Sequence, residues 1–217
     1  MTKTLLLLLS CLPVLSLSAY ASSPSQIIND AEWTLKKSAD GVKVYASTIA
    51  NSKHKAVLAT TTVEASPQQV INLIRDTQTC TQWVYRCKSS KIYKAVNAQE
   101  EYIYTSIRMP FPFSNRDILA HIKWTTNPDT HVTVSTGIAT KGILEKQRHH
   151  SRIENATMIW EITPQDNGQT TIRSYGHIDP AGEMPTWLSN RFSSKAPLNT
   201  MIKLRKLLAS TDKKAPI

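Results

Sequence analysis

The histidines are the side chains of this sequence best suited to acid–base or metal chemistry, and their surroundings favour a structural role. His149 and His150 lie in the polar stretch 146–152, which predicts a solvated loop, with an anion or metal site as the alternative. His121 and His177 alternate with apolar residues, so we expect them on the strand faces opposite those residues. We predict no cofactor and no bound metal.

Arg116 and Asp117 form the other group with possible chemistry, a charged pair just before a predicted strand. Adjacent residues of a strand point to opposite faces, so these two are not expected to pair with each other. Fixing the turn before the strand is the favoured role, and a functional ion pair is the alternative. The sequence also contains no Gly-x-Ser-x-Gly elbow, His-Glu-x-x-His pair or glycine-rich phosphate loop. An enzyme is therefore not the favoured class.

The first 21 residues predict a signal peptide. Lys3 is their only charged side chain, and the apolar run 5–17 is too short to span a bilayer. Ala19 and Ala21 fit the small-x-small pattern of a cleavage site. Cleavage after Ala21 would leave a periplasmic or secreted protein, with one domain over 22–210 and a flexible tail over 211–217.

Removal of the signal leaves two cysteines, Cys80 and Cys87. In an oxidising compartment we expect them to form a disulfide, with two buried free thiols as the alternative. Seven residues of continuous helix would hold their Cα atoms about 10 Å apart, whereas a disulfide tolerates about 7 Å. The helix that begins at Pro67 must therefore end before Cys87, and we place its end in the stretch 76–79, which is rich in weak helix formers.

The chain carries 26 lysines and arginines against 16 acidic residues, a formal net charge of +10. Such a surface favours anionic partners, and for an exported protein we expect an anionic membrane surface. No basic run is interleaved with aromatic residues, so nucleic acid is not an expected partner. The cations that motivate membrane contact cluster near the C-terminus: Lys203, Lys206, Lys213 and Lys214. A basic surface that serves solubility alone is the alternative.

The elements predicted from the pattern form an α+β domain. Strand alternation dominates 89–178, with turn signals at Asp40-Gly41 and Asn167-Gly168. Such strands in series predict an antiparallel sheet with one buried face. A long helical stretch over 179–208 closes the chain, and Pro197 is expected to kink it or reset its register. The sheet is expected to curl around this helix.

Three stretches of the chain together resemble the START domain, the lipid-transfer module of the helix-grip superfamily. The similarity covers about 33–208, and it is the order and spacing of the stretches that make it specific. They are the helix ending at Asp76 with Trp83 beyond it, the proline-containing turn and Arg-Asp pair of 109–117, and the segment 178–188 leading to Leu204 and Arg205.

The resemblance implies a barrel-like curved sheet closed by the C-terminal helix around one lipid or other apolar molecule. From the strand alternation and the helix stripe, we expect the lining to be Ile103, Ile107, Met109, Ile118, Ile122, Trp124, Trp160, Met184, Leu188 and Phe192. Arg191 and Lys195 fall within the helix stripe, so either they reach the cavity mouth or the helix is irregular there.

Sterol-carrying START domains place a buried acid–base pair on two neighbouring strands. Aligned on Arg116 and Asp117 without gaps, those positions fall at Ile103 and Ile122. This departure predicts a more uniformly apolar cavity without a polar sterol anchor.

The leading hypothesis is therefore an exported lipid-binding or lipid-transfer protein. Two alternatives stay open at this point. One is a cyclase-like enzyme on the same fold that acts on a bound apolar molecule. The other is an envelope protein with a filled core, whose basic surface binds membrane.

Overall fold

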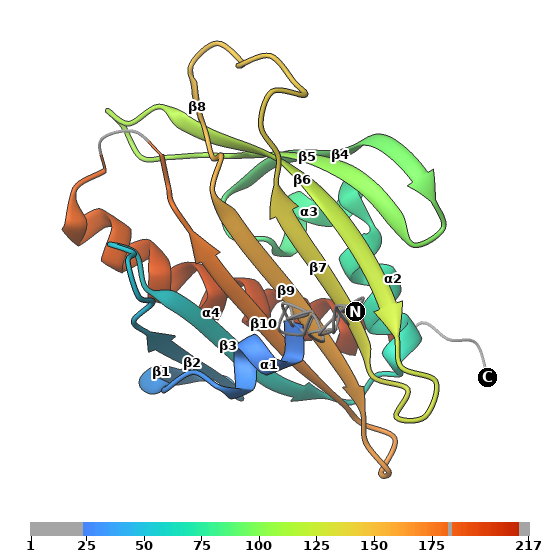
Figure 1. Ribbon diagram of the computed structural model, residues 1–217. Helices are drawn as coiled ribbons and strands as arrows, with labels where there is room; N and C mark the ends of the chain where they lie inside the picture. The colour runs from blue at the N-terminus through green and yellow to red at the C-terminus, as the bar shows by residue number, and fades with distance from the viewer. Residues whose placement is uncertain (1–23, 182–183, 213–217) are drawn as a thin grey trace, which may run out of the picture.

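The computed structural model describes residues 24–181 and 184–212. A curved sheet of ten strands surrounds the long helix α4, and four short helices lie against the two (Figure 1). The helices are α1 (Pro24–Asn29), α2 (Pro67–Arg75), the 3-10 helix η1 (Thr77–Thr79), α3 (Cys80–Trp83) and α4 (Thr186–Asp212). The strands are β1 (Thr34–Ala39), β2 (Val42–Ser47), β3 (Ala56–Val63), β4 (Cys87–Asn97), β5 (Glu100–Ile107), β6 (Asn115–Thr126), β7 (Thr133–Ala139), β8 (His150–Arg152), β9 (Ala156–Pro164) and β10 (Thr170–Ile178).

The strand order is β1-β2-β3-β10-β9-β7-β6-β5-β4, and every pair along this path is antiparallel. A tight turn occurs where the sequence predicts it, between β1 and β2. Asp40 and Gly41 both have positive φ, of 50° and 73°, as a two-residue hairpin requires. The predicted α+β architecture, a curved antiparallel sheet with a long C-terminal helix, is confirmed. The short strand β8 pairs in parallel with β6, in a stretch that we expected to be a solvated loop.

The buried face of α4 changes along its length. Met201, Leu204 and Leu208 are buried against β2, β3, β9 and β10, whereas Leu188 is buried in the first half. At about 100° per residue, Leu188 and Met201 lie about 140° apart around the helix axis. The helix continues through Pro197 without a break. It extends to Asp212, two residues into the segment that we expected to be a tail.

Both faces of the central sheet are buried, not one as the sequence predicted. On the face away from α4, Ile28 of α1 packs on Leu58, Ile159 and Tyr175. Trp33 completes this second core, with its ring edge-on to Tyr175 and its Nε1 donating to the Ile28 carbonyl at 2.7 Å. We call this the outer face, and the face toward α4 the inner face.

A disulfide joins Cys80 and Cys87, whose Cα atoms lie 6.0 Å apart. The chain makes the required turn because α2 ends at Arg75, and the Asp76 side chain then caps η1 by accepting a hydrogen bond from the Gln78 amide. The predicted bridge and the predicted helix end are both confirmed.

Reduction of this disulfide should destabilise the folded protein by about 2.5 kcal/mol, because the bridge closes a short loop and restricts the unfolded chain. Urea unfolding with and without reductant measures this difference. An unchanged unfolding midpoint, or alkylation of both thiols without reductant, would contradict the prediction.

Candidate functional site

The strand residues of the predicted lining lie on the inner face. The antiparallel register places Ile103 opposite Ala120 and Ile107 opposite Arg116. Side chains of directly opposite residues lie on the same face of a sheet, so the predicted lining residues of β5 and β6 share one face. Ile122, Trp124 and Trp160 pack against the core that includes α4, and Ile118 lies on the same side of β6. Met109 lies in the turn after β5, and Met184 lies just before α4.

The inner face has a tightly packed part and a looser part. Val42, Val44, Ile162 and Ile172 are fully buried beneath the second half of α4. In contrast, inner-face side chains of the strands from β5 to β9 keep partial exposure although they lie within the sheet: Ile103, Ile107, Ile122, Met158 and Trp160. Four of these five residues, all but Met158, belong to the predicted lining, whereas Ile118, Trp124 and Leu188 of that lining are buried.

The position of α4 accounts for this difference. Its backbone lies close to β1, β2 and β3 on one side and to α2 and α3 on the other, and β5, β6 and β7 are not among its close neighbours. In its first half, Phe192 packs edge-on against Tyr85 from the segment after α3. Gly137 on β7 is in close contact with Ile122, because a Cβ there would lie 2.7 Å from its Cδ1. The inner faces of β5 and β6 thus do not have the α4 backbone as a close neighbour.

The two cations of the helix stripe belong to this first half of α4. Lys195 is half-buried, and the Asn199 side chain donates to its carbonyl at 2.8 Å. The side chain of Arg191 lies outside those that the structure describes. Because α4 runs unbroken past both positions, the alternative of an irregular helix is not supported.

The inner face also carries a charged residue that the sequence analysis missed. Glu101 pairs with Ile122 across β5 and β6, and it is only 5% exposed. Its Oε1 has no hydrogen-bond partner, and the Arg75 Nε of α2 is 4.0 Å away. Trp124, 7% exposed, has an unpartnered Nε1 and lies with its ring 5.5 Å from the Arg75 guanidinium carbon. The expectation of a uniformly apolar lining is therefore wrong at this end of β5 and β6.

Arg116 and Asp117 do not pair with each other, as predicted, and each has its own structural role. The Arg116 guanidinium is buried and donates to the carbonyls of Pro180 at 2.7 Å and Ala181 at 3.0 Å. This contact ties the start of β6 to the segment that leads into α4. Burial lowers the pKa of Arg116, but the hydrogen bonds to carbonyls suit a charged guanidinium.

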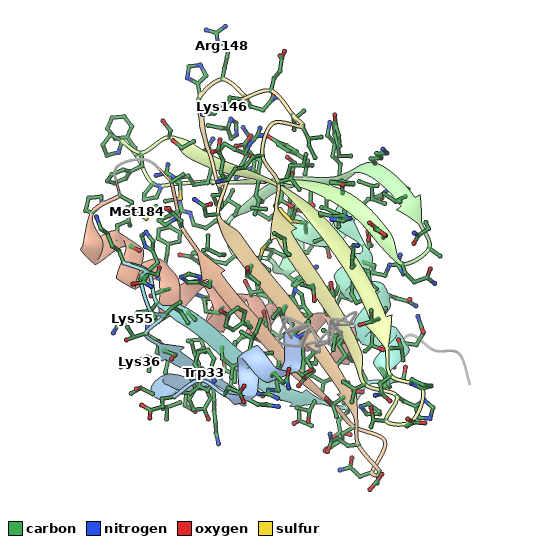
Figure 2. The ribbon with its side chains drawn as sticks, viewed as in Figure 1. Trp33, Lys36, Lys55, Lys146, Arg148 and Met184 are labelled. Carbon is green, nitrogen blue, oxygen red and sulfur yellow. A yellow bond between two sulfur atoms is a disulfide. The ribbon has the colours of Figure 1, made fainter. Side chains whose placement is uncertain are left out.

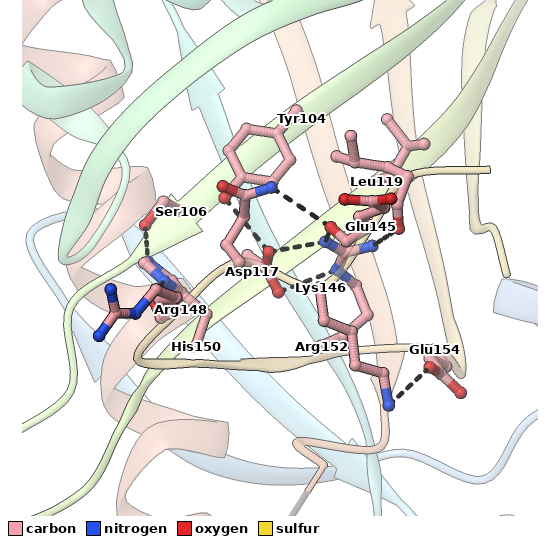
Figure 3. A network of polar contacts seen from close by, with 12 residues as sticks. Tyr104, Ser106, Asp117, Leu119, Glu145, Lys146, Arg148, His150, Arg152 and Glu154 are labelled. Atoms are coloured by element: carbon pink, nitrogen blue, oxygen red, sulfur yellow. Dashed lines mark hydrogen bonds and ion pairs between the residues drawn. The ribbon is translucent and has the colours of Figure 1, made fainter. Parts of the chain in front are cut away.

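Asp117 forms a buried ion pair on the outer face, shown in Figure 3. Arg152 of β8 donates to both of its carboxylate oxygens at 2.9 Å, and the Tyr104 hydroxyl donates to Oδ2 at 3.2 Å. The same guanidinium donates to the carbonyls of Leu144 and Glu145, each at 3.0 Å. This network holds the loop between β7 and β8 onto β6.

Because of this network around Asp117, we expect the free energy of unfolding to depend on pH. Burial, and then the charge of Asp117, raises the pKa of Tyr104 to about 12, against about 10 in the unfolded chain. The folded state therefore favours the neutral phenol, and this stabilisation is complete below about pH 10 and lost as the pH rises to about 12. Urea unfolding should show the stability of the wild type falling relative to Tyr104→Phe across this range. A constant difference between the two proteins would contradict the prediction.

The histidines lie outside the inner face. His121 and His177 are on the outer face, as predicted, and His121 stacks on Tyr102 and bonds Glu100 at 2.6 Å. This hydrogen bond is the main cause that lowers the pKa of Glu100. His150, which we expected in a solvated loop, begins β8 and bonds Ser106 at 2.9 Å. No group of three metal-ligating side chains occurs in the part of the chain that the structure describes.

A groove of about 760 Å³ opens on the outer face, between the β2–β3 loop and the ends of β7, β9 and β10. Its lining mixes Ile49 and Ile138 with charged residues such as Lys53, Lys141 and Glu154. None of the predicted lining residues borders it. We therefore place the candidate site for an apolar molecule at the inner face, where partly exposed apolar side chains lie, and not in this groove.

A family model described as START domain matches residues 26–214 of the chain. The chain belongs to the START domain family. This agrees with the resemblance found in the sequence and with the curved sheet that holds α4.

The chain is similar to one relative by sequence and to two solved structures of START-related proteins. An uncharacterized protein of Pseudomonas aeruginosa is 31% identical over 175 residues, which cover 80% of this chain and 85% of that protein. The crystal structure of a STAR-related lipid transfer protein from Xanthomonas axonopodis is 26% identical, covers 82% of this chain and 98% of its own, and superposes with a TM-score of 0.75. Human StAR-related lipid transfer protein 5 is 13% identical, covers 87% of this chain and 93% of its own, and reaches a TM-score of 0.79, which shows the shared helix-grip fold.

Proposed function

We propose that this START domain is an exported, non-enzymatic lipid carrier that holds one lipid between the inner face of the sheet and the first half of α4. The observation that carries the proposal is the group of partly exposed apolar side chains within the sheet, where a filled core would be fully buried. The Xanthomonas axonopodis protein is described as a lipid transfer protein, and it shares the fold over most of this chain, which supports the proposal.

The apolar lining can supply the affinity. Each methylene removed from water contributes about 0.8 kcal/mol, so a chain of about 15 methylenes gains roughly 12 kcal/mol before the costs of association. Few polar contacts are then needed. The unpartnered Glu101 Oε1 and Trp124 Nε1 add an acceptor and a donor, which a lipid with a hydroxyl or amide group would satisfy together.

Export is proposed from the sequence, because the predicted signal peptide lies outside the described residues, as do Lys213 and Lys214 of the C-terminal basic cluster. Among the helices of the described chain, none is long and apolar enough to cross a membrane. An anionic membrane as donor or acceptor is proposed from the net charge of +10.

Transfer between vesicles tests the proposal. Donor vesicles carrying a fluorescent lipid with a quencher should lose the probe to acceptor vesicles at a rate proportional to protein concentration. A transfer rate equal to that of buffer, for both phospholipid and fatty-acid probes, would contradict the proposed function. Turnover of the probe to a new chemical species would instead support an enzyme.

A further inference from the structure

The groove on the outer face lies on the other side of the sheet from the proposed lipid site. Its volume of about 760 Å³ falls within the range of roughly 300–1,000 Å³ that is usual for small-molecule sites. Its floor is a row across three strands, because Ile138 of β7 pairs with Thr157 of β9, and Thr157 pairs with His177 of β10.

Two sets of connections form the walls of the groove. The β2–β3 loop is one wall, and the connections that follow β7 and β8 are the other. In Figure 2, Lys55 marks the β2–β3 loop and Lys146 the β7–β8 loop, and the two lie well apart. The groove is therefore open along the sheet and bounded on both sides.

Hydrogen bonds fix the β2–β3 loop onto the end of β10. The Ser52 hydroxyl accepts a hydrogen bond from the His54 amide at 3.1 Å, and the Ser52 amide donates to the Ile49 carbonyl at 3.2 Å. From the floor, Nε2 of His177 lies 2.9 Å from the Ser52 hydroxyl oxygen and 3.2 Å from the His54 carbonyl oxygen. The wall is therefore preformed, and a bound molecule would not have to order it.

Ser52, His177 and Asp179 are the residue types of a hydrolytic triad, but their contacts do not suit that chemistry. A carbonyl oxygen can only accept, so the contact with the His54 carbonyl requires a proton on Nε2 of His177. Nε2 then donates to Ser52 as well, and it cannot take the proton that a serine nucleophile has to lose. The Asp179 carboxylate lies 3.5 Å from Nε2 of His54. We therefore expect the groove to bind a molecule and not to transform it.

The charged side chains of the groove leave a surplus of positive charge. Of its two acids, one lies against His54, as described above, and Glu154 lies 3.7 Å from the Lys146 ammonium. Lys53 and Lys141 are exposed, and they take part in no ion pair among the residues that the structure describes. The groove therefore favours an anion.

The two lysines stand on opposite walls, with apolar side chains between them. β10 and β9 lie between β3 and β7, so at about 4.8 Å per strand the walls are roughly 14 Å apart. Ile138 on the floor is 54% exposed, and Ile49 at the β2–β3 wall is partly exposed. Two isoleucines offer an apolar surface for a compact ring system, not for the long acyl chain proposed for the inner face.

We propose that this groove is a second ligand site, which binds a small soluble anion with an apolar ring body, such as an aromatic carboxylate or sulfonate. The rings cover Ile138 and Ile49, and the acidic group meets Lys53 or Lys141 at a wall. Small-molecule sites commonly combine an apolar surface with a few polar groups that fix the orientation. The inference does not depend on the lipid-carrier function, because the groove lies on the opposite face and shares no residue with the predicted lining.

Isothermal titration calorimetry of the purified protein with naphthalene-2-sulfonate tests the site. The double variant Lys53→Gln/Lys141→Gln should bind this anion about tenfold more weakly at low salt, because both cations of the walls are removed. The matched control Lys88→Gln/Lys94→Gln removes the same charge from exposed positions of edge strand β4 and should bind like wild type. Equal losses in the two double variants would overturn the proposal.

A neutral ligand tests the requirement for negative charge. Naphthalene-2-methanol has the same rings with a hydroxyl in place of the acidic group. It should bind the wild type at least about tenfold more weakly than the sulfonate does, because it cannot pair with a lysine. Equal affinity for the two molecules would overturn the proposal.

Two single variants determine on which face the anion binds. Ile138→Glu should weaken sulfonate binding at least about tenfold, because it removes apolar contact and adds a like charge to the floor. Ile122→Glu, on the inner face, should leave sulfonate binding unchanged. A wild type that binds no sulfonate, or sulfonate binding that is lost in Ile122→Glu and kept in Ile138→Glu, would overturn the proposal.

A fluorescent fatty acid should show the opposite pattern in the same two variants. A wild type that binds the sulfonate but no fatty acid would support the second site and contradict the carrier function. The failure of one proposal can thus be told apart from the failure of the other.

Discussion

Replacing Ile122 by glutamate is expected to abolish lipid binding while leaving the protein folded. The side chain lies on the inner face of β6, next to Gly137, within the looser part of that face. A carboxylate there would face the ligand without a partner, at a cost of several kcal/mol to the complex, and would stand opposite the buried Glu101. Titration of a fluorescent fatty acid should show a loss of affinity of at least about 100-fold, because each 1.4 kcal/mol corresponds to about a factor of ten.

Ile138→Glu is the matched control for this variant. Ile138 lies on the neighbouring strand β7, on the outer face, and its side chain is already exposed. The same substitution there should leave lipid binding unchanged, and circular dichroism should show both variants folded. Unchanged binding by a folded Ile122→Glu protein would show that the ligand does not occupy the inner face.

Breaking the buried ion pair of Asp117 and Arg152 should cause the largest loss of stability of any single substitution proposed for this chain. Arg152→Met leaves the Asp117 carboxylate at the bottom of the β7–β8 loop with the Tyr104 hydroxyl as its remaining side-chain donor. Removing one partner of such a buried pair costs about 3–5 kcal/mol, because an uncompensated charge stays buried. Urea unfolding measures the loss.

Two further variants locate the cause. Adding Asp117→Leu to Arg152→Met should recover part of the lost stability, since no buried charge then remains. Lys146→Gln, which breaks a neighbouring exposed pair with Glu154, should cost at most about 1 kcal/mol. A loss of under about 1 kcal/mol for Arg152→Met would mean that water reaches Asp117 and that the pair does not fix the loop.

Local signals made much of this fold predictable. Ser66 and Gln69 form a reciprocal capping box at the start of α2, directly before Pro67, where the sequence analysis begins this helix. Alternation in β5 and β6 assigned Ile103 and Ile122 to the correct face, because the side-chain period of a strand leaves no other choice once one face is apolar. These features depend on residues near each other in the chain, so the sequence displays them.

The features that could not be predicted depend on contacts between distant segments. β8 is three residues long and pairs with β6, more than 30 residues earlier in the chain, so no periodicity marks it. Arg152 finds Asp117 in the same way. Glu101 shares the alternation of Ile103, which would place it on the inner face. Glutamates are seldom buried, however, so its charge favoured a solvent-exposed position.

Native mass spectrometry of the protein, purified gently from its host, tests the central claim most directly. We predict a species heavier than the protein alone by the mass of one lipid, and loss of that species in Ile122→Glu but not in Ile138→Glu. Protein that is free of lipid after purification, and that takes up none when incubated with vesicles, would contradict the lipid-carrier function and favour a filled, vestigial core.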